Sequence, residues 1–282
     1  MKDLIFNLVI LLTIFILISC FYFCINKKSI KIIRLKDKNS KKSIQIADNK
    51  LLTKKILLEN NISTPKGIVF DKEKDNFDFN INMNFPLVIK PINEMKSRGV
   101  VTDIENKQEL INELQKSKYK KLIIEEQVEG DLFRILVADG IVVDIIVKKN
   151  AFIIGDGVKT IKEHENLNKK VKIDKRFLKK QGFSKDMIVP LNKKVFLTRI
   201  PLVIRGAKSQ VVDISKVHKD NLDMFKKASL KTGLRFTGID FICKNISESY
   251  KKNNGMIIEL NANPFMKPHR KQVRNRIKKI LN

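Results

Sequence analysis

The fold is decided by two stretches, Thr237-Gly-Ile-Asp-Phe241 and Ile257-Ile-Glu-Leu-Asn-Ala-Asn-Pro264. Residues two apart on a β-strand point to the same face, so Glu259 and Asn261 project together. If the two apolar stretches pair as neighbouring strands, Asp240 can join them. Hard oxygen ligands on a rigid sheet suit Mg²⁺ that arrives with a nucleotide phosphate. The pattern therefore predicts a metal site made of Asp240, Glu259 and Asn261, and with it phosphoryl chemistry.

The composition allows several classes of partner. The 282 residues are enough for a domain with a full core and a membrane segment besides. The net charge of +27 attracts nucleic acid, anionic lipid, nucleotides or acidic polymers. The charge is spread along the chain, and Lys, Asn and Ile are abundant throughout, so the codon bias of the genome is the plainer explanation of the charge. With no Trp and three Tyr, the chain lacks the aromatic pattern for stacking single strands, and nucleic acid is not expected as a partner.

The N-terminus predicts a membrane anchor. Residues 4–25 form a 22-residue apolar run, which is long enough to cross a bilayer. A lipoprotein processing box at Leu17-Ile-Ser-Cys20 is the alternative, but the apolar run continues past Cys20. Residues 27–42 then carry eight basic side chains against one acid, which places the main domain in the cytoplasm. We predict a transmembrane helix over 1–26, a basic juxtamembrane linker over 27–45 and one domain over 46–282. The three cysteines have no metal-ligand spacing and fit a reducing compartment.

The rest of the chain alternates helical and strand patterns, which indicates an α+β fold. Residues 135–138 and 141–147 are expected to form a hairpin around Asp139-Gly140. Thr160, after the turn Gly155-Asp-Gly157, is expected to cap a helix. Further helices are expected at 46–60, 105–118, 220–232 and 267–282, and further strands at 62–70, 85–90 and 121–126.

Two further segments carry groups suited to binding a nucleotide, although each signal is weak by itself. Lys90 closes an apolar strand before a loop that contains Ser97-Arg-Gly-Val100, so its ammonium can meet a phosphate that loop amides cradle. The strand that ends at Glu125-Glu-Gln-Val128 can offer backbone groups to an adenine and acidic groups to an amine or ribose. A surface lysine and an exposed acidic strand end are the plain alternatives.

Taken in order, these segments resemble the ATP-grasp superfamily, and most of all the ATP-grasp domain of cyanophycin synthetase and of the bifunctional glutathione synthetases. The resemblance runs from about Ile46 to His269 and includes the helix that begins Ala47-Asp-Asn-Lys50. It implies two α/β subdomains that grip ATP and an ADP-forming ligase that makes an amide through an acyl phosphate. The cofactors it implies are ATP and Mg²⁺, with Mn²⁺ as a substitute, and the substrates are amino acids or peptides.

The resemblance also assigns roles to residues. Lys50 and Lys90 would hold phosphates, and Arg98 with the amides of Ser97 and Gly99 would cover them. Arg199 and Arg205 would bind the negatively charged acyl group and act in catalysis, because a guanidinium group can form two parallel hydrogen bonds to such an anion. The adenine site would include Glu125, Glu126 and Val128, with Asp131 near the ribose. His269 would contact the substrate.

Several positions depart from the family pattern. Glu94 and Ser97 replace loop glycines, Leu132 stands where an acid often binds ribose, and Phe265 replaces a glycine. The Ser-Thr-Gly-Gly stretch of the family becomes Ile204-Arg-Gly-Ala207. No further domain is expected before or after this region, so cyanophycin synthesis itself is not expected either. A catalytically impaired, membrane-anchored nucleotide-binding scaffold is the alternative function. The sequence does not indicate an oligomeric state.

Overall fold

The computed structural model describes residues 38–94, 97–167, 171, 173–201, 206–269 and 271–281. The predicted transmembrane helix and most of the basic linker lie outside these residues, as does Arg205. Within the described ranges, no helix has the length and apolar character needed to cross a bilayer. The described residues belong to one compact unit, Lys38–Asn282.

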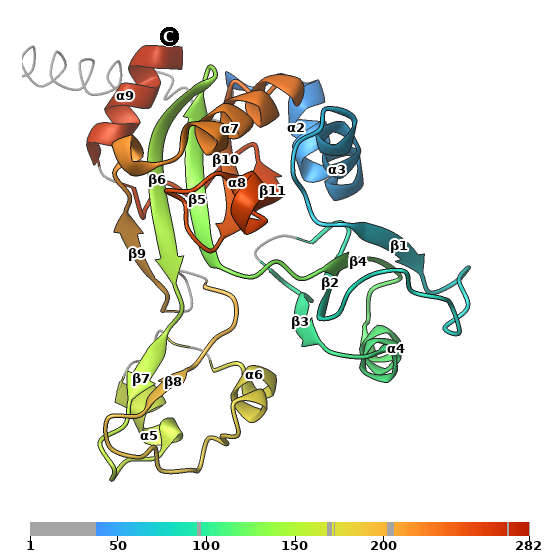
Figure 1. Ribbon diagram of the computed structural model, residues 1–282, viewed down its shortest axis with the longest axis vertical. Coiled ribbons are helices and arrows are strands. Elements are labelled where there is room, and N and C mark those ends of the chain that lie inside the picture. Colours follow the sequence, from blue (N-terminus) through green and yellow to red (C-terminus); the bar gives the residue numbers. More distant parts are fainter. Residues whose placement is uncertain are drawn as a thin grey trace, which may run out of the picture. The chain divides into compact units, whose positions relative to one another are not determined.

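Helices and strands alternate along the chain, as the sequence predicts for an α+β fold (Figure 1). The helices are α2 (Lys41–Asp48), α3 (Lys50–Glu59), α4 (Lys107–Lys116), α5 (Ile161–Leu167), α6 (Lys175–Lys180), α7 (Lys219–Lys231), α8 (Tyr250–Asn253) and α9 (Lys271–Leu281). The strands are β1 (Gly67–Asp71), β2 (Leu87–Pro91), β3 (Val101–Ile104), β4 (Lys121–Glu126), β5 (Asp131–Ala138), β6 (Ile141–Lys149), β7 (Phe152–Ile154), β8 (Lys194–Phe196), β9 (Lys208–Val211), β10 (Phe236–Cys243) and β11 (Met256–Asn261).

The first sheet has the strand order β1-β4-β2-β3, and each neighbouring pair is antiparallel. Each of its strands contributes one or two buried apolar side chains to one core, and α4 covers them with Leu110 and Leu114. Phe70 packs against Phe77 and Phe79 at the end of β1. This small core positions Lys90 on β2 and Glu125 on β4.

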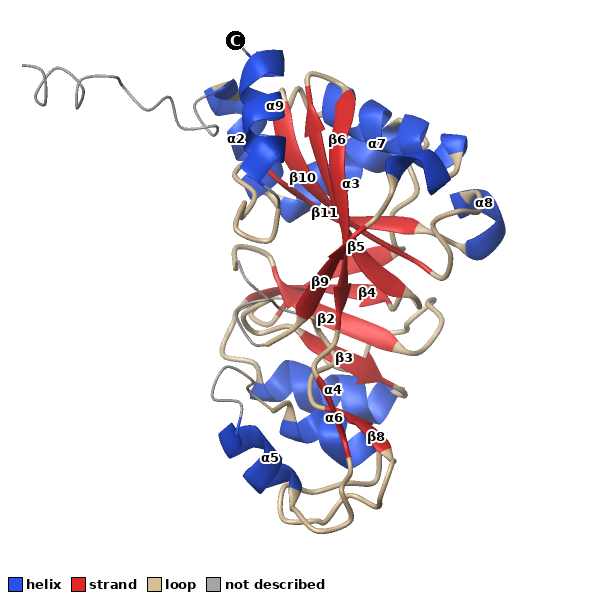
Figure 2. Cartoon of the chain, turned by 90° about the vertical axis from the view of Figure 1, so that its left-hand side faces the viewer, coloured by secondary structure: helices blue, strands red, loops and turns tan. Residues whose placement is uncertain are grey.

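The second sheet has the order β11-β10-β5-β6-β9 and is also antiparallel throughout. Helices α7 and α9 both contact β5 and β6, and the sheet strands and the helices around them can be followed in Figure 2. Phe225 of α7 packs edge-on against Phe241 of β10. Because β10 is nearly all apolar, it can lie buried between β5 and β11, and this burial fixes the position of Asp240.

A third, smaller group of elements consists of the β7–β8 ribbon with α5 and α6. It has a core of its own that includes Ile161, Leu178 and Val195. The expected cap of α5 is present as a reciprocal pair: the Glu163 amide donates to Thr160 Oγ1, and the Thr160 amide donates to the Glu163 carboxylate.

The expected elements are confirmed with shifted ends, except that the helix predicted over 46–60 is two helices. Asn49 ends α2, and its side chain then accepts hydrogen bonds from the amides of Leu51 and Leu52 at the start of α3. An Asn side chain competes for backbone amides in this way and favours a helix start over a helix interior. The predicted hairpin at Asp139-Gly140 is confirmed, with φ of 43° and 73° at its two central residues.

Candidate active site

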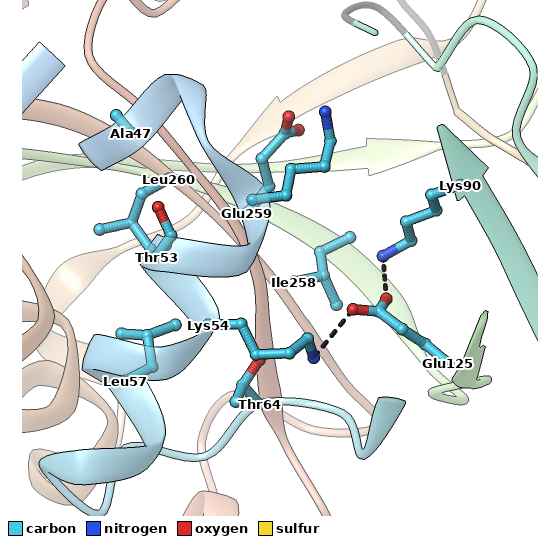
Figure 3. Close-up of a pocket in the computed structure, with 11 residues that line it drawn as sticks. Ala47, Thr53, Lys54, Leu57, Thr64, Lys90, Glu125, Ile258, Glu259 and Leu260 are labelled. Atoms are coloured by element: carbon cyan, nitrogen blue, oxygen red, sulfur yellow. Dashed lines mark ion pairs between the residues drawn. The ribbon is translucent and has the colours of Figure 1, made fainter. Parts of the chain in front are cut away.

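A pocket lies where helix α3 and strand β11 meet β2 and β4 (Figure 3). Its charged lining consists of three lysines and two glutamates, which face one another across the pocket. The lining residues are Ala47, Lys50, Thr53, Lys54, Leu57, Thr64, Lys90, Glu125, Ile258, Glu259 and Leu260. The first sheet and the second sheet therefore both contribute side chains to this one pocket.

Glu125 is a buried carboxylate held between two ammonium groups, as Figure 3 shows. Lys54 Nζ lies 2.8 Å from Glu125 Oε1, and Lys90 Nζ lies 2.5 Å from Oε2. Burial opposes ionisation of Glu125, but Lys90 and Lys54 outweigh it and hold the pKa of the carboxyl below its usual value. Two lysines share one carboxylate, so the cluster keeps an excess positive charge that suits a phosphate.

Lys50 points toward the loop that follows β2. Its ammonium donates to the carbonyl of Glu94 at 2.5 Å and to that of Ile92 at 3.3 Å. Burial lowers the pKa of Lys50, and the nearby Glu259 carboxylate opposes this shift while Lys90 adds to it. The two lysines that the sequence predicts as phosphate ligands thus lie in the same pocket, beside the loop predicted to cover the phosphates.

Strands β10 and β11 pair, which is the condition on which the predicted metal site depends, and Asp240 lies directly opposite Glu259. Both of its oxygens are already bound: Arg134 Nε donates to Oδ1 at 2.7 Å, and Arg134 Nη2 donates to Oδ2 at 2.8 Å. Lys148 Nζ lies 3.0 Å from Oδ1. Burial opposes ionisation, but these two cations lower the pKa of Asp240 to about 2. Asp240 is therefore a fully ionised and ion-paired carboxylate.

Glu259 differs from Asp240 because no cation in the described part of the chain forms an ion pair with it. Its half-buried side chain feels both burial and the Asp240 charge, and these raise its pKa. Asn261 follows on the same face of β11, and its side-chain amide donates to the Gly238 carbonyl at 3.4 Å, a marginal distance. Glu259 thus offers a carboxylate that no ion pair within the described ranges occupies, directly beside the ion-paired Asp240.

These residues therefore fit a hard divalent cation such as Mg²⁺. Asp240, Glu259 and Asn261 supply oxygens from one face of two adjacent strands. No group of three or more His, Cys, Asp or Glu side chains within the described ranges is placed to hold a metal by itself. The amide oxygen of Asn261 is thus needed to complete the set, together with oxygens from outside the protein such as those of a phosphate.

Comparison with known proteins agrees with this geometry. Residues 47–170 match the family model described as the RimK-like ATP-grasp domain. The chain carries an ATP-grasp domain. It is 27% identical over 249 residues to a cyanophycin synthetase of a Synechocystis species, covering 80% of this chain and 28% of the relative. It is 30% identical over 247 residues to the bifunctional glutathione biosynthesis protein GshAB of Clostridium perfringens, covering 79% of this chain and 32% of the relative. The chain thus spans less than a third of either protein.

Solved structures support the same fold for the ATP-grasp domain. A D-alanine–D-alanine ligase from Bacillus anthracis superposes with a TM-score of 0.58 at 19% identity, over 86% of this chain and 70% of the other. A bifunctional glutathione synthetase from Pasteurella multocida superposes with a TM-score of 0.55 at 21% identity, over 86% and 37%. At these identities the likeness establishes the ATP-grasp fold alone.

Other predicted nucleotide-binding residues lie outside the pocket lining. Arg98 is exposed and pairs with Glu94 at 3.3 Å, while Ser97 and Gly99 have φ of 54° and 69° in the loop. Glu126 Oε1 accepts from the Asn84 amide at 2.9 Å, and Val128 is half-buried just after β4. Asp131 forms an ion pair with Lys149 near the surface of the ATP-grasp domain. Their roles in nucleotide binding stay predictions.

The residues predicted for the substrate side are dispersed. Arg199 is bound by two carboxylates, Asp103 at 3.0 Å and Glu129 at 3.1 Å. The His269 side chain is fully buried, and its Nδ1 lies 2.5 Å from Asp144 Oδ2. Arg205 lies outside the described residues. Arg199 would have to leave its two partners to meet an acyl group, and His269 in this position contacts the sheet instead of a pocket.

Three basic side chains at the candidate active site were not predicted from the sequence. Lys54 follows Lys50 by one helical turn and reaches the same pocket, so the four-residue spacing could have revealed it. Arg134 interrupts the apolar run of β5, and a charged residue inside such a run signals a buried partner. Lys148 comes directly after the apolar run of β6 and gives no such signal. Asp240 is the partner of both residues.

We expect Lys90→Gln to weaken ATP binding more than it slows chemistry. The substitution removes a positive charge that faces the pocket but leaves Glu125 paired with Lys54, so the fold should be retained. A charge-assisted contact to a phosphate contributes about 1.5–3 kcal/mol, so KM for ATP should rise roughly 10- to 100-fold. Steady-state ADP release against ATP concentration measures this. Lys55→Gln is the control, because it removes an exposed ammonium group on α3 that pairs with Glu59 outside the pocket, and it should leave KM unchanged.

Proposed function

We propose that the chain is an ATP- and Mg²⁺-dependent carboxylate–amine ligase that forms an amide or peptide bond on an amino acid or peptide. One observation carries this proposal: Lys50 and Lys90 enter a single pocket that also contains Glu259, on the strand next to Asp240. Cations for phosphates thus lie beside oxygen ligands for their metal. The similar proteins are named as a cyanophycin synthetase, a bifunctional glutathione biosynthesis protein and a D-alanine–D-alanine ligase, which agrees with this chemistry.

The reaction would occur in two displacements. An oxygen of the substrate carboxylate attacks the γ-phosphorus of ATP, the bond from that phosphorus to the β,γ-bridging oxygen breaks, and ADP leaves. The amine nitrogen then attacks the acyl carbon of the acyl phosphate, phosphate leaves, and the nitrogen loses a proton. Lys50 and Lys90 would hold the phosphates in line for the first displacement. Mg²⁺, when bound by Asp240, Glu259 and Asn261, would offset the charge on the transferred phosphoryl group.

The identity of the substrates is a separate part of the proposal. Arg199 and Arg205 are the candidates for the acyl donor, because their guanidinium groups can bind a carboxylate in a bidentate manner. The net charge of +27 favours acidic substrates over basic ones. The acceptor side departs most from the family pattern, at Phe265 and around Arg205, so the amine is expected to differ from those of the named relatives.

We also infer that the chain is held at a membrane by residues 4–25, with its ATP-grasp domain on the cytoplasmic side. The support is the sequence: an apolar run of spanning length followed by the basic residues of 27–42. ATP is available on that side of a cell membrane.

The activity is tested by supplying the full chain with ATP, Mg²⁺ and pairs drawn from a panel of amino acids and short peptides. We expect ADP and phosphate to form only when a carboxylate and an amine are present together, and mass spectrometry should find the joined product. Formation of AMP would contradict the acyl-phosphate route. Binding of ATP without turnover across the whole panel would favour the scaffold alternative.

A further inference from the structure

The C-terminal helix α9 presents an uncompensated basic surface. Its apolar side chains Val273, Ile277 and Leu281 are buried, which fixes the opposite side of the helix toward solvent. That exposed side carries five cations and no acid within the helix. We call it the α9 basic face, and it consists of Lys271, Arg274, Arg276, Lys278 and Lys279, all of them exposed. Within the described part of the chain, none of the five forms an ion pair with a carboxylate.

The chain enters the folded domain beside this helix. Lys38 Nζ donates a hydrogen bond to the carbonyl of Leu281, in the last turn of α9, at 3.0 Å. Asn39 is buried and bonds the carbonyl oxygens of Phe236 and Ala262, so the entry point is fixed to the second sheet. Lys41 and Lys42 follow at the start of α2, and both are exposed. In Figure 1, the C-terminal end of α9 can be found by the mark for the C-terminus.

The distance along the chain from the apolar run to α9 is short. Ile25 and Lys38 are 13 positions apart (38 − 25 = 13), and a fully extended chain spans at most ~3.6 Å per residue, or about 47 Å. If residues 4–25 cross a bilayer, Lys38, which contacts the end of α9, can therefore lie no farther than about 47 Å from the end of the membrane-spanning run.

We propose that the α9 basic face binds the anionic headgroups of the membrane in which the chain is anchored. This inference rests on the proposed membrane anchorage. Five unpaired cations on one helix complement a negatively charged leaflet. Three of them, Lys271, Arg274 and Lys278, follow the i, i+3, i+7 spacing that lines one stripe of a helix. Docking through α9 would orient the ATP-grasp domain on the membrane and set the direction from which substrates reach the pocket.

A nucleic acid is the other polyanion that such a surface could bind. The membrane is favoured because the chain carries an apolar run of bilayer-spanning length within ~47 Å of Lys38, which contacts the helix. Tethering raises the effective concentration of headgroups at α9, whereas nothing tethers a nucleic acid there. The absence of Trp from the sequence also removes the strongest stacking residue for single strands.

Lysine footprinting on the full chain tests the proposal. The protein is placed in nanodiscs of phosphatidylcholine alone or of phosphatidylcholine with phosphatidylglycerol, and acetylation of each lysine by a membrane-impermeant reagent is followed by mass spectrometry. We expect Lys271, Lys278 and Lys279 to react several-fold more slowly in the anionic discs, and this protection to disappear at high salt. The exposed lysines Lys193, Lys244 and Lys252 are the internal controls and should react at the same rate in both discs.

A pair of charge variants makes the test independent of the labelling chemistry. Replacing Lys271, Arg274 and Lys278 together by Gln should remove the protection of Lys279, while replacing Lys193, Lys244 and Lys252 by Gln should not. Neither set lies in the pocket, so ADP formation without lipid should be unchanged in both. Equal reactivity of the α9 lysines in the two discs would overturn the proposal. Protection by RNA or DNA in place of anionic lipid would assign the surface to nucleic acid and also overturn it.

The experiment distinguishes a chain that lacks a membrane anchor from a chain whose α9 basic face does not bind lipid. A chain without a membrane anchor would not enter discs of phosphatidylcholine alone, where headgroup charge plays no part. In that case the same footprint is taken on the free chain with added phosphatidylglycerol vesicles, and unprotected α9 lysines would still contradict the proposal. Loss of ADP formation, measured on the same samples, would bear on the ligase proposal only.

Discussion

Replacing Glu259 by Gln should abolish ADP formation and leave the protein folded. Two of the predicted metal ligands are carboxylates, Asp240 and Glu259, and they lie opposite each other. Asp240 is ion-paired, whereas Glu259 has no ion-pair partner among the described residues. Its charge is therefore free to act on a cation and its phosphates. Removing a group that stabilises transition-state charge typically slows turnover by ~10²–10³-fold, so we expect a loss of at least this size. The rate of ADP release with a working substrate pair measures it.

The stability of the same variant separates a functional charge from a structural one. Burial and the Asp240 charge raise the pKa of Glu259 in the folded protein. A carboxyl with a raised pKa binds its proton more tightly when folded, so its contribution to stability is full below the unfolded pKa and is lost as the pH rises through the folded pKa. The glutamine amide of the variant stays neutral at every pH. The free energy of unfolding of the variant at neutral pH should therefore equal or exceed that of the wild type.

The control is Glu59→Gln, which removes an exposed carboxylate at the end of α3 whose one ion pair among the described residues is with Lys55 at 3.8 Å. It should change neither turnover nor, by more than about 0.5 kcal/mol, stability. Urea unfolding of the three proteins in the absence of metal gives the comparison. A Glu259→Gln protein that turns over at the wild-type rate would refute the metal assignment.

The sequence predicts the features of the site that depend on local periodicity. The period of two on β11 places Glu259 and Asn261 on one face, and the observed register adds Asp240 directly opposite Glu259. The helix that carries Lys50 and the strand that ends at Lys90 follow from apolar spacing and from their order along the chain. These patterns are enough to identify the ATP half of the site because each residue is placed by the element to which it belongs.

The rest of the site depends on pairing between distant strands, which periodicity does not reveal. Arg134 lies 106 positions from Asp240 and Lys148 lies 92 positions away, yet β5 pairs with both β10 and β6 and brings both cations to the same carboxylate. His269 shows the same limitation: it stands in a motif that resembles a substrate loop, but its partner is Asp144 on β6, 125 positions earlier. Without the register of the sheet, the sequence does not distinguish a side chain that binds a ligand from one that belongs to a structural ion pair.

Asp240→Asn should destabilise the protein by about 3–5 kcal/mol, because it leaves Arg134 and Lys148 without their shared counter-charge. The side chains concerned are largely buried: 8% of Asp240, 13% of Arg134 and 10% of Lys148 is exposed. The matched control is Asp139→Asn, which breaks a similar two-bond contact with Arg235 at 2.8 and 2.6 Å. That pair is 32% and 51% exposed, so its loss should cost no more than about 1 kcal/mol.

The pH dependence of unfolding identifies the same ion pair. The pKa of Asp240 is lowered to about 2, below the ordinary value of 3.8, so its contribution to stability is full above the ordinary value and is lost as the pH falls through about 2. Asp240→Asn should remove this part of the acid dependence, whereas Asp139→Asn should keep it.

The activity of Asp240→Asn has to be compared with its stability, because unfolding and loss of a metal ligand both abolish ADP formation. If the variant is as stable as the wild type but inactive, Asp240 acts on the metal alone. If it is unstable while Glu259→Gln is stable and inactive, Asp240 holds the cations of the sheet in place and Glu259 supplies the free negative charge for the metal.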